Sequence, residues 1–193
     1  MDARNEEKRY TYTDYCEWDD DTRYELIDGT VYVMSPAPSQ AHQTIVGRLF
    51  RIISNYLDNT PYRIFMAPFD VRLNAGSGDD TVVQPDLIIV CDNSKLDGKA
   101  CVGAPDMAIE VLSQSTARRD RLEKFRLYEK AGVGEYWIVD YKNSIIHVHI
   151  LENGRYFTQV FGDGDNLPIH SLEGCAINLS DVFMESWNNV ETI

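Results

Sequence analysis

The sequence is poor in cysteine, in long apolar runs and in positive charge. Its four cysteines are widely spaced and form no Cys-x-x-Cys pair, so neither a disulfide framework nor a zinc site is predicted. The longest apolar run, residues 87–91, is far shorter than the roughly 20 residues that span a membrane. The charged N-terminus lacks the apolar stretch of a signal peptide. These absences predict a cytoplasmic protein that has no membrane partner.

The shortage of positive charge limits the partners that the protein could bind. The chain has 18 Lys and Arg against 31 Asp and Glu, a net charge of −13. Such a surface repels nucleic acid and anionic membranes on average. The excess lies at the two ends, so any nucleic-acid contact is expected from the middle, where residues 118–130 are densest in basic side chains. Taken alone, that segment is more typical of an exposed helix face with mixed charges than of a nucleic-acid contact.

Turn and strand signals indicate an α+β layout with a mixed central sheet. The length of 193 residues, with 44% hydrophobic and 25% charged, suits one globular domain. Asp-Gly at 28–29 and Asn-Gly at 153–154 each predict a β-hairpin, one near either end of the chain, because these pairs tolerate positive φ angles. The apolar runs at 87–91 and 107–112 predict central strands buried on both faces.

Two helices are expected to flank this sheet. Apolar residues recur at helical spacing over 41–57, and Ser39 is a suitable N-cap. A second helix is expected to start at Ser115 or Thr116 and to run to about residue 131, where Gly132 ends it.

Two acidic residues occupy positions where burial is costly. Glu110 interrupts the second apolar run, and Asp86 opens the first one, within Gln84-Pro85-Asp86. A buried carboxylate costs several kcal/mol unless it is paired, hydrogen-bonded or bound to a cation. Each acid alone could form a salt bridge or cap a strand end. Together on adjacent strands they favour a Mg²⁺ site, because Mg²⁺ prefers one or two carboxylates with water and substrate oxygens.

Lys124 is the third polar residue with an unusual position. It lies on the apolar stripe that continues through Leu127, Tyr128 and Ala131, which should face the sheet. An inward lysine beside two carboxylates could orient water or stabilise negative charge. The simpler alternative is a lysine whose ammonium extends from the helix edge into solvent.

A pair of histidines, His147 and His149, should share one face of a strand. Such pairs can bind transition metals. Because the sequence offers no third ligand, a partly exposed hairpin is the more common explanation.

These motifs together resemble the Uma2 family, also described as DUF820, a family of restriction-endonuclease-like proteins in the PD-(D/E)XK nuclease superfamily. The resemblance extends from about residue 10 to residue 183. It implies a single domain over residues 1–193 with a restriction-endonuclease-like fold. It rests on these segments: YELIDGTVYVM, SPAPSQAHQ, VVQPDLIIV, PDMAIEVLSQST and RRDRLEKFRLYEKAGVGEYWIVD.

The resemblance also implies roles for individual residues. Asp86 and Glu110 match the metal-binding acids and Lys124 matches the lysine. In the general superfamily pattern the lysine stands two residues after the acid, where this chain has Leu112. Glu25 matches a recurrent family acid that would add a ligand or orient water, although a hairpin glutamate is often simply exposed. His42 matches a family position too, but it could form only a local hydrogen bond.

The function predicted from these residues is Mg²⁺-dependent hydrolysis of phosphodiester bonds in DNA, with Mn²⁺ able to substitute. Asp86, Glu110 and the carbonyl of Val111 would hold the ion. The residues expected to receive the nucleic-acid backbone are Arg118, Arg119 and Arg121. A homodimer is expected from the resemblance, because duplex cleavage usually needs two sites.

Two alternatives remain open at this point. One is a non-catalytic binding or assembly protein that retains the nuclease fold, and the other is a hydrolase of a smaller phosphorylated substrate. The net charge of −13 suits both, and the chain has no recognisable DNA-reading element.

Overall fold

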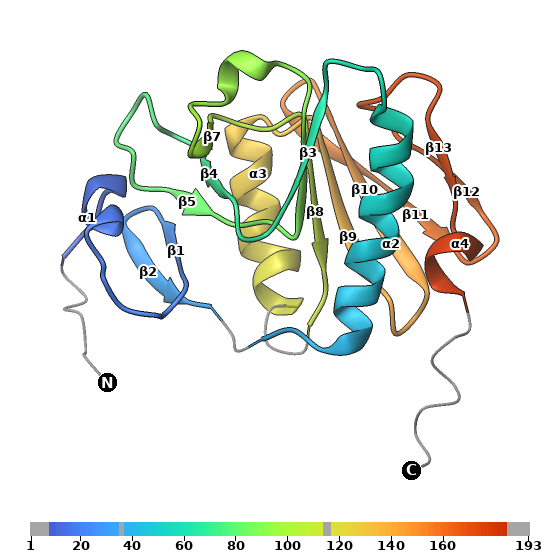
Figure 1. Cartoon of the computed structure of the whole chain (residues 1–193), viewed down its shortest axis with the longest axis horizontal. Coiled ribbons are helices and arrows are strands. Elements are labelled where there is room, and N and C mark those ends of the chain that lie inside the picture. Colours follow the sequence, from blue (N-terminus) through green and yellow to red (C-terminus); the bar gives the residue numbers. More distant parts are fainter. Residues whose placement is uncertain (1–7, 35–36, 114–116, 185–193) are drawn as a thin grey trace, which may run out of the picture.

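The structure is a computed structural model that describes residues 8–34, 37–113 and 117–184. A six-stranded mixed sheet lies at its centre, in the order β11-β10-β9-β8-β6-β3 (Figure 1). β8 and β9 are parallel, and the other neighbours in this sheet are antiparallel. The strands of this sheet are β3 Arg63–Met66, β6 Leu87–Val90, β8 Met107–Val111, β9 Glu135–Asp140, β10 Ile145–Glu152 and β11 Arg155–Gly162.

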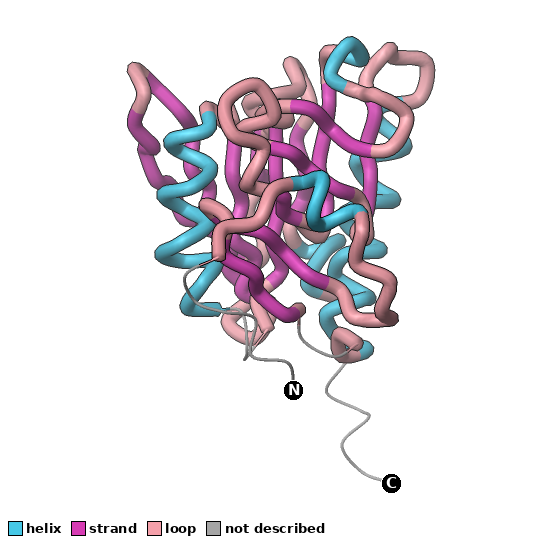
Figure 2. Tube along the Cα trace, turned by 90° about the vertical axis from the view of Figure 1, so that its left-hand side faces the viewer, coloured by secondary structure: helices cyan, strands magenta, loops and turns pink. Residues whose placement is uncertain are grey.

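Helices cover both faces of the central sheet, as Figure 2 shows. One face packs against α2, Gln40–Leu57. The other face packs against α3, Phe125–Ala131, which continues the π-helical segment η2, Arg119–Lys124. Because β8 and β9 are parallel, η2 and α3 provide the crossover between them. The remaining helices are short: α1 Tyr12–Cys16, η1 Asn93–Lys95 and α4 Ser180–Phe183.

Two smaller sheets complete the layers. A five-stranded sheet in the order β2-β1-β5-β4-β7 lies on the α3 side, and its Val71, Val83 and Cys101 join the apolar cluster there. On the α2 side, β12 and β13 contribute Leu167 and Ile177 to the other cluster. These strands are β1 Tyr24–Ile27, β2 Thr30–Val33, β4 Asp70–Arg72, β5 Val82–Val83, β7 Ala100–Val102, β12 Asn166–Pro168 and β13 Ala176–Asn178.

The alternation of side chains along β8 decides which face Glu110 reaches. Met107, Ile109 and Val111 belong to the cluster on the α2 side, whereas Ala108 belongs to the cluster on the α3 side. Since neighbouring residues in a strand point to opposite faces, Glu110 points toward α3. The expected burial of this strand is confirmed, because all five of its residues are buried.

Both predicted hairpins and the first predicted helix are confirmed. Residues 28–29 and 153–154 have positive φ angles and connect β1 to β2 and β10 to β11. The Ser39 side chain caps α2 as expected. The mixed α+β architecture with flanking helices is also as predicted. Among the described residues, no helix has the length and apolarity that crossing a membrane requires.

The second helix differs in part from the prediction. It ends at Gly132, whose φ of 87° is left-handed, as expected. Its predicted caps, Ser115 and Thr116, lie outside the described residues. Its first half is π-helical rather than α-helical, over Arg119–Lys124. Apolar spacing does not separate these two forms over a single turn, and π-helical turns occur frequently at functional sites.

Candidate active site at the junction of the two sheets

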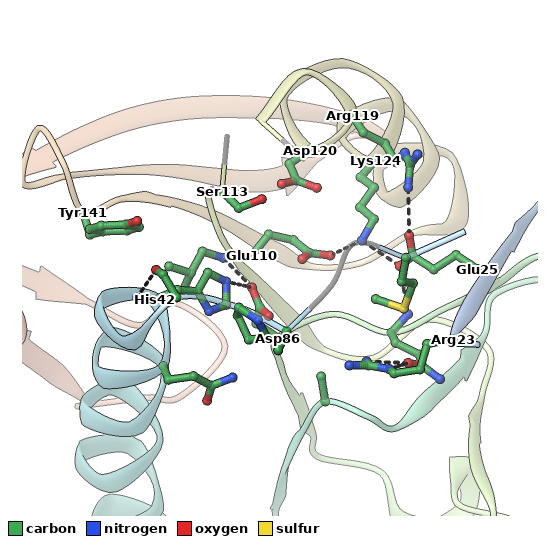
Figure 3. A pocket seen from close by; sticks show the side chains of 18 of the residues that line it. Arg23, Glu25, His42, Asp86, Glu110, Ser113, Arg119, Asp120, Lys124 and Tyr141 are labelled. Atoms are coloured by element: carbon green, nitrogen blue, oxygen red, sulfur yellow. Dashed lines mark hydrogen bonds and ion pairs between the residues drawn. The ribbon is translucent and has the colours of Figure 1, made fainter. Parts of the chain in front are cut away.

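A pocket of about 560 Å³ lies where β1, β8, η2 and the first turn of α2 meet (Figure 3). Four acidic and five basic side chains line it, and they come from six segments that are distant in the sequence. They are Glu25, Asp86, Glu110, Asp120, Arg23, His42, Arg119, Lys124 and Lys142. We call it the acidic pocket, after the four acids.

Asp86 and Glu110 meet because of the register between their strands. β6 and β8 are antiparallel with Leu87 opposite Ile109, so Asp86, one residue before β6, lies level with Glu110. Asp86 is fixed there because its Oδ2 accepts the backbone N–H of Val111 at 2.8 Å. The predicted placement of both acids at adjacent strands is therefore confirmed.

Lys124 points into the pocket and joins two carboxylates. Its Nζ is 2.7 Å from Oε1 of Glu110 and 2.8 Å from Oε1 of Glu25. Both Lys124, at 4% exposure, and Glu25, at 2%, are buried. The alternatives of a lysine extended into solvent and an exposed hairpin glutamate are wrong for this structure. Tyr128, one turn further along the helix, also donates its hydroxyl to Oε1 of Glu110 at 3.0 Å.

The π-helical segment brings a fourth carboxylate to the site. Asp120 and Lys124 are both buried in η2, at 1% and 4% exposure, and both line the pocket (Figure 3). Asp120 was not predicted from the sequence. Its signal is its position four residues before Lys124, which places the two side chains on nearly the same face of a helix.

The acidic excess controls the protonation of the buried groups. Burial raises the pKa of Glu110 well above its ordinary value, Lys124 opposes this shift, and Asp120, Asp86 and Glu25 add to it. For Lys124, burial lowers the pKa, but Glu110, Glu25 and Asp120 outweigh burial and raise the pKa well above its ordinary value. Lys124 is therefore a cation, and the site would hold Glu110 as an anion more readily with a further cation nearby.

His42 contacts Asp86 and not merely its own helix. Its Nε2 lies 3.2 Å from Oδ2 of Asp86, and Ser39 caps the same turn of α2 by accepting the backbone N–H of His42. Burial lowers the pKa of His42, but the hydrogen bond and the charge of Asp86 raise it more, so the net shift is upward. The interaction of His42 thus supports the position of Asp86.

The donor set fits a hard divalent cation better than a transition metal. Among the described residues, no group of three or more His, Cys, Asp or Glu side chains is arranged to hold a metal ion. The hydrogen bonds and ion pairs of Asp86 and Glu110 involve Oδ2 of Asp86 and Oε1 of Glu110. This leaves Oδ1 of Asp86 and Oε2 of Glu110 as the oxygens that could take a cation. Val111 lines the same pocket. Two carboxylates with a main-chain oxygen and water are the ligands that Mg²⁺ accepts.

The three predicted DNA-contacting arginines do not share one surface. Arg119 faces the acidic pocket, 3.7 Å from Oε2 of Glu25 and with its guanidinium 4.5 Å from the ring centre of Tyr32. Arg121 pairs with Asp140 at 2.9 Å and lines a different pocket. Arg118 is exposed. Of the three, Arg119 is the arginine that lines the acidic pocket.

A network behind Glu25 was also missed by sequence reasoning. The backbone N–H of Gln84 donates to Oε1 of Glu25 at 3.1 Å. The Gln84 side chain donates to Asp70 at 2.8 Å and accepts from Arg23 at 2.6 Å. These contacts fix β1 to the residues that precede Asp86. The sequence pattern did not predict them, because it did not show which strand lies beside β1.

Comparison with solved structures finds a protein that shares this fold. A crystal structure described as "a putative nuclease belonging to DUF820", from Anabaena variabilis, superposes with a TM-score of 0.73 and 18% identity. The match covers 90% of this chain and 97% of that one. The predicted restriction-endonuclease-like fold is thereby confirmed.

The sequence comparisons then give the family. The Uma2 family, described as "Putative restriction endonuclease", matches residues 11–180, so this chain belongs to the Uma2 family. An uncharacterized protein of Synechocystis sp. is 26% identical over 163 residues, which are 82% of this chain and 84% of that protein.

Proposed function

We propose that this protein is a Mg²⁺-dependent endonuclease that hydrolyses phosphodiester bonds of DNA. The observation that carries the proposal is the pair Asp86 and Glu110 beside the buried Lys124, whose ammonium lies 2.7 Å from Glu110. The family description, "Putative restriction endonuclease", and the fold shared with a protein described as "a putative nuclease" support the same reaction class.

In this proposal Asp86, Glu110 and the Val111 carbonyl hold the cation, for which Mn²⁺ can substitute. When bound, the ion lowers the pKa of a water molecule and offsets charge on the scissile phosphate. Lys124 stabilises the negative charge that develops on that phosphate, or orients the attacking water. Glu25 and Tyr128 act through Lys124 and Glu110 as positioning residues, since they hydrogen-bond or ion-pair with them.

The test is cleavage of supercoiled plasmid and of single-stranded DNA at low salt, with Mg²⁺, with Mn²⁺ and with EDTA. Wild-type protein should nick plasmid only with metal, and Glu110→Gln should abolish nicking. Glu123→Gln is the matched control, because it makes the same substitution at an exposed glutamate of η2, the segment that contains Lys124. Equal nicking by wild type and Glu110→Gln would reject the site.

A second candidate is hydrolysis of a smaller phosphorylated substrate. The net charge of −13 favours it, since long polyanions are repelled by such a surface. Metal-dependent hydrolysis of bis(p-nitrophenyl) phosphate that Glu110→Gln abolishes, without any plasmid nicking, would select this candidate. A non-catalytic binding protein would show neither activity.

We also propose that the active protein is a homodimer, because cutting both strands of a duplex usually needs two symmetry-related sites. Light scattering coupled to gel filtration tests this directly. A monomer at the concentration used for cleavage would contradict it.

A further inference from the structure

A second pocket, of about 310 Å³, lies on the other side of the π-helical segment η2. Arg119, Asp120 and Lys124 line the acidic pocket, whereas Arg121 and Leu122 line the second one. The same segment therefore forms a wall of both pockets, although they share no lining residue.

The floor of this pocket contains a buried histidine. His149 on β10 is 6% exposed, and its Nδ1 lies 2.8 Å from Oγ1 of Thr158 on β11. Its Nε2 has no hydrogen-bond partner among the described residues. Buried polar groups are nearly always paired, so one that is not paired and borders a pocket points to a ligand.

The walls around His149 are uncharged and mostly apolar. Burial, and then His147, lower the pKa of His149 to about 4, so its imidazole is neutral at physiological pH. The side chains of Leu122, Phe125 and Ile138 supply apolar surface around it. These walls suit a flat, uncharged ring that carries a hydrogen-bonding group.

The rim of the pocket, in contrast, is cationic. Arg121 and Arg126 both line it and both are exposed. Arg121 is held by Asp140 at 2.9 Å and lies 3.5 Å from Nε2 of His147. Guanidinium groups bind phosphate oxygens in this setting. A ligand that matches the whole pocket has an uncharged heteroaromatic ring at one end and a phosphate at the other.

We propose that this second pocket binds a nucleobase, with Nε2 of His149 hydrogen-bonded to an edge of the base and the attached phosphate at Arg121 and Arg126. The inference rests on the proposed function, because it assigns the base to the nucleic-acid substrate of the same protein. Free nucleotides and nucleic-acid strands both present this chemistry. A nucleobase held here would fix the strand beside η2 while another part of the substrate lies at Lys124.

The experiment uses the full chain labelled with ¹⁵N, in EDTA, so that binding is measured without cleavage. The chain has four histidines, and the ring nitrogens of each can be followed by NMR. Nucleoside monophosphates, ribose 5-phosphate, inorganic phosphate and a short single-stranded oligonucleotide are titrated in parallel. The expected result is a saturable shift of the His149 Nε2 resonance with nucleoside monophosphates or with the oligonucleotide. Saturation by the oligonucleotide alone would identify the strand as the source of the base.

Two results would overturn the inference. One is no shift of His149 with any nucleotide or oligonucleotide. The other is an equal shift with ribose 5-phosphate, which would reduce the pocket to a site for anions. If either result is found while the protein still nicks plasmid, the proposed function stands and only the nucleobase site is rejected. If His149 shifts with nucleotides but the protein does not nick plasmid, only the proposed function is rejected.

A surface variant keeps the test independent of folding. Leu122 is 52% exposed, so Leu122→Ser removes apolar wall without opening the core. It should weaken nucleotide binding by about fivefold, the effect of losing part of one apolar contact. Met66→Ser is the matched control, because Met66 is 46% exposed on β3, at the opposite end of the central sheet from β10 and β11. Equal affinity of the Leu122 and Met66 variants would contradict the proposed wall.

Discussion

Two buried glutamates on neighbouring strands of the central sheet have opposite environments. Glu135 on β9 is fully buried on the α2 side, where its carboxylate accepts the indole N–H of Trp137 and the backbone N–H of Ser171, both at 2.7 Å. Glu110 on β8 faces the α3 side, beside Lys124 and three further carboxylates. Both oxygens of Glu135 are engaged by neutral donors, whereas Glu110 lies in an excess of like charge.

The difference marks Glu135 as a structural acid and supports the role proposed for Glu110. Neutral donors compensate Glu135 within the protein, so it ties β9 to the loop before β13 and needs no further partner. Glu110 shares one ammonium with Glu25, while Asp120, Asp86 and Glu25 add negative charge around it. Burial alone would have assigned both residues the same role, and only their partners distinguish them.

The largest expected effect is on catalysis by Glu110→Gln. This change keeps the size of the side chain but removes the charge that would hold the cation, so cleavage should fall by about a thousandfold or more. The free energy of unfolding should stay the same or rise, because a buried charge is removed. Plasmid nicking rates and urea unfolding measure the two effects. A marked loss of stability would make Glu110 resemble Glu135 and weaken the comparison.

Removing the shared ammonium should cost the most stability. In Lys124→Met the carboxylates of Glu25 and Glu110 remain buried without their cation, and the free energy of unfolding at neutral pH should fall by about 3–5 kcal/mol. Urea unfolding measures this loss. Lys130→Met, at an exposed position on α3, is the control and should change stability little. Combining Lys124→Met with Glu110→Gln should cost less stability than the sum of the two single changes, and an additive result would deny the coupling.

The reverse pattern is expected for Glu135→Gln. The new amide group would present a donor to a neighbour that is itself a donor, either Trp137 or Ser171, so stability should fall by about 3 kcal/mol. Cleavage per folded molecule should remain at the wild-type level. Thermal unfolding followed by Trp fluorescence gives the first quantity, and nicking assays below the transition give the second. A cleavage defect in folded Glu135→Gln would show that the α2 face also serves the site.

The smallest effect concerns the neutral imidazole of His149. Its pKa of about 4 in the folded state is below the ordinary value of 6.5, so the unfolded chain binds more protons between these values. The contribution of His149 to the free energy of unfolding is therefore fully present above pH 6.5 and decreases as the pH falls toward 4. The decrease is about 2 kcal/mol at pH 5. His149→Phe should remove that part of the pH dependence. Urea unfolding of both proteins at pH 7.5 and at pH 5 gives the loss of unfolding free energy of each. An equal loss in the two proteins would contradict the prediction.

Much of this architecture follows from local patterns in the sequence. The hairpin at 28–29 and the helix stop at Gly132 depend on backbone conformations that few residues adopt, so single positions predict them. Glu110 was recognisable because a carboxylate within an apolar run is costly. The position of Lys124 required more than spacing, since the apolar stripe alone left the solvent-facing alternative open.

What the sequence did not predict depends on contacts between distant segments. β5 and β7 contain two and three residues, which is too short for alternation to be recognised. Asp120 is one acidic residue among charged neighbours, so its composition gives no sign that it is buried in η2. The contact of His42 with Asp86 joins α2 to the start of β6, and no local sequence pattern predicts a contact between these two segments.

Lys124 also has a mechanical consequence for the molecule. Glu25 belongs to the five-stranded sheet and Glu110 to the six-stranded sheet, and a single Nζ atom contacts both within 2.8 Å. A displacement of one sheet relative to the other must therefore lengthen at least one of these two ion pairs or move the lysine. The spacing between the sheets and the charge balance around Glu110 are thus linked, so that a force applied to the β1–β2 hairpin is transmitted to Glu110 through one ammonium group.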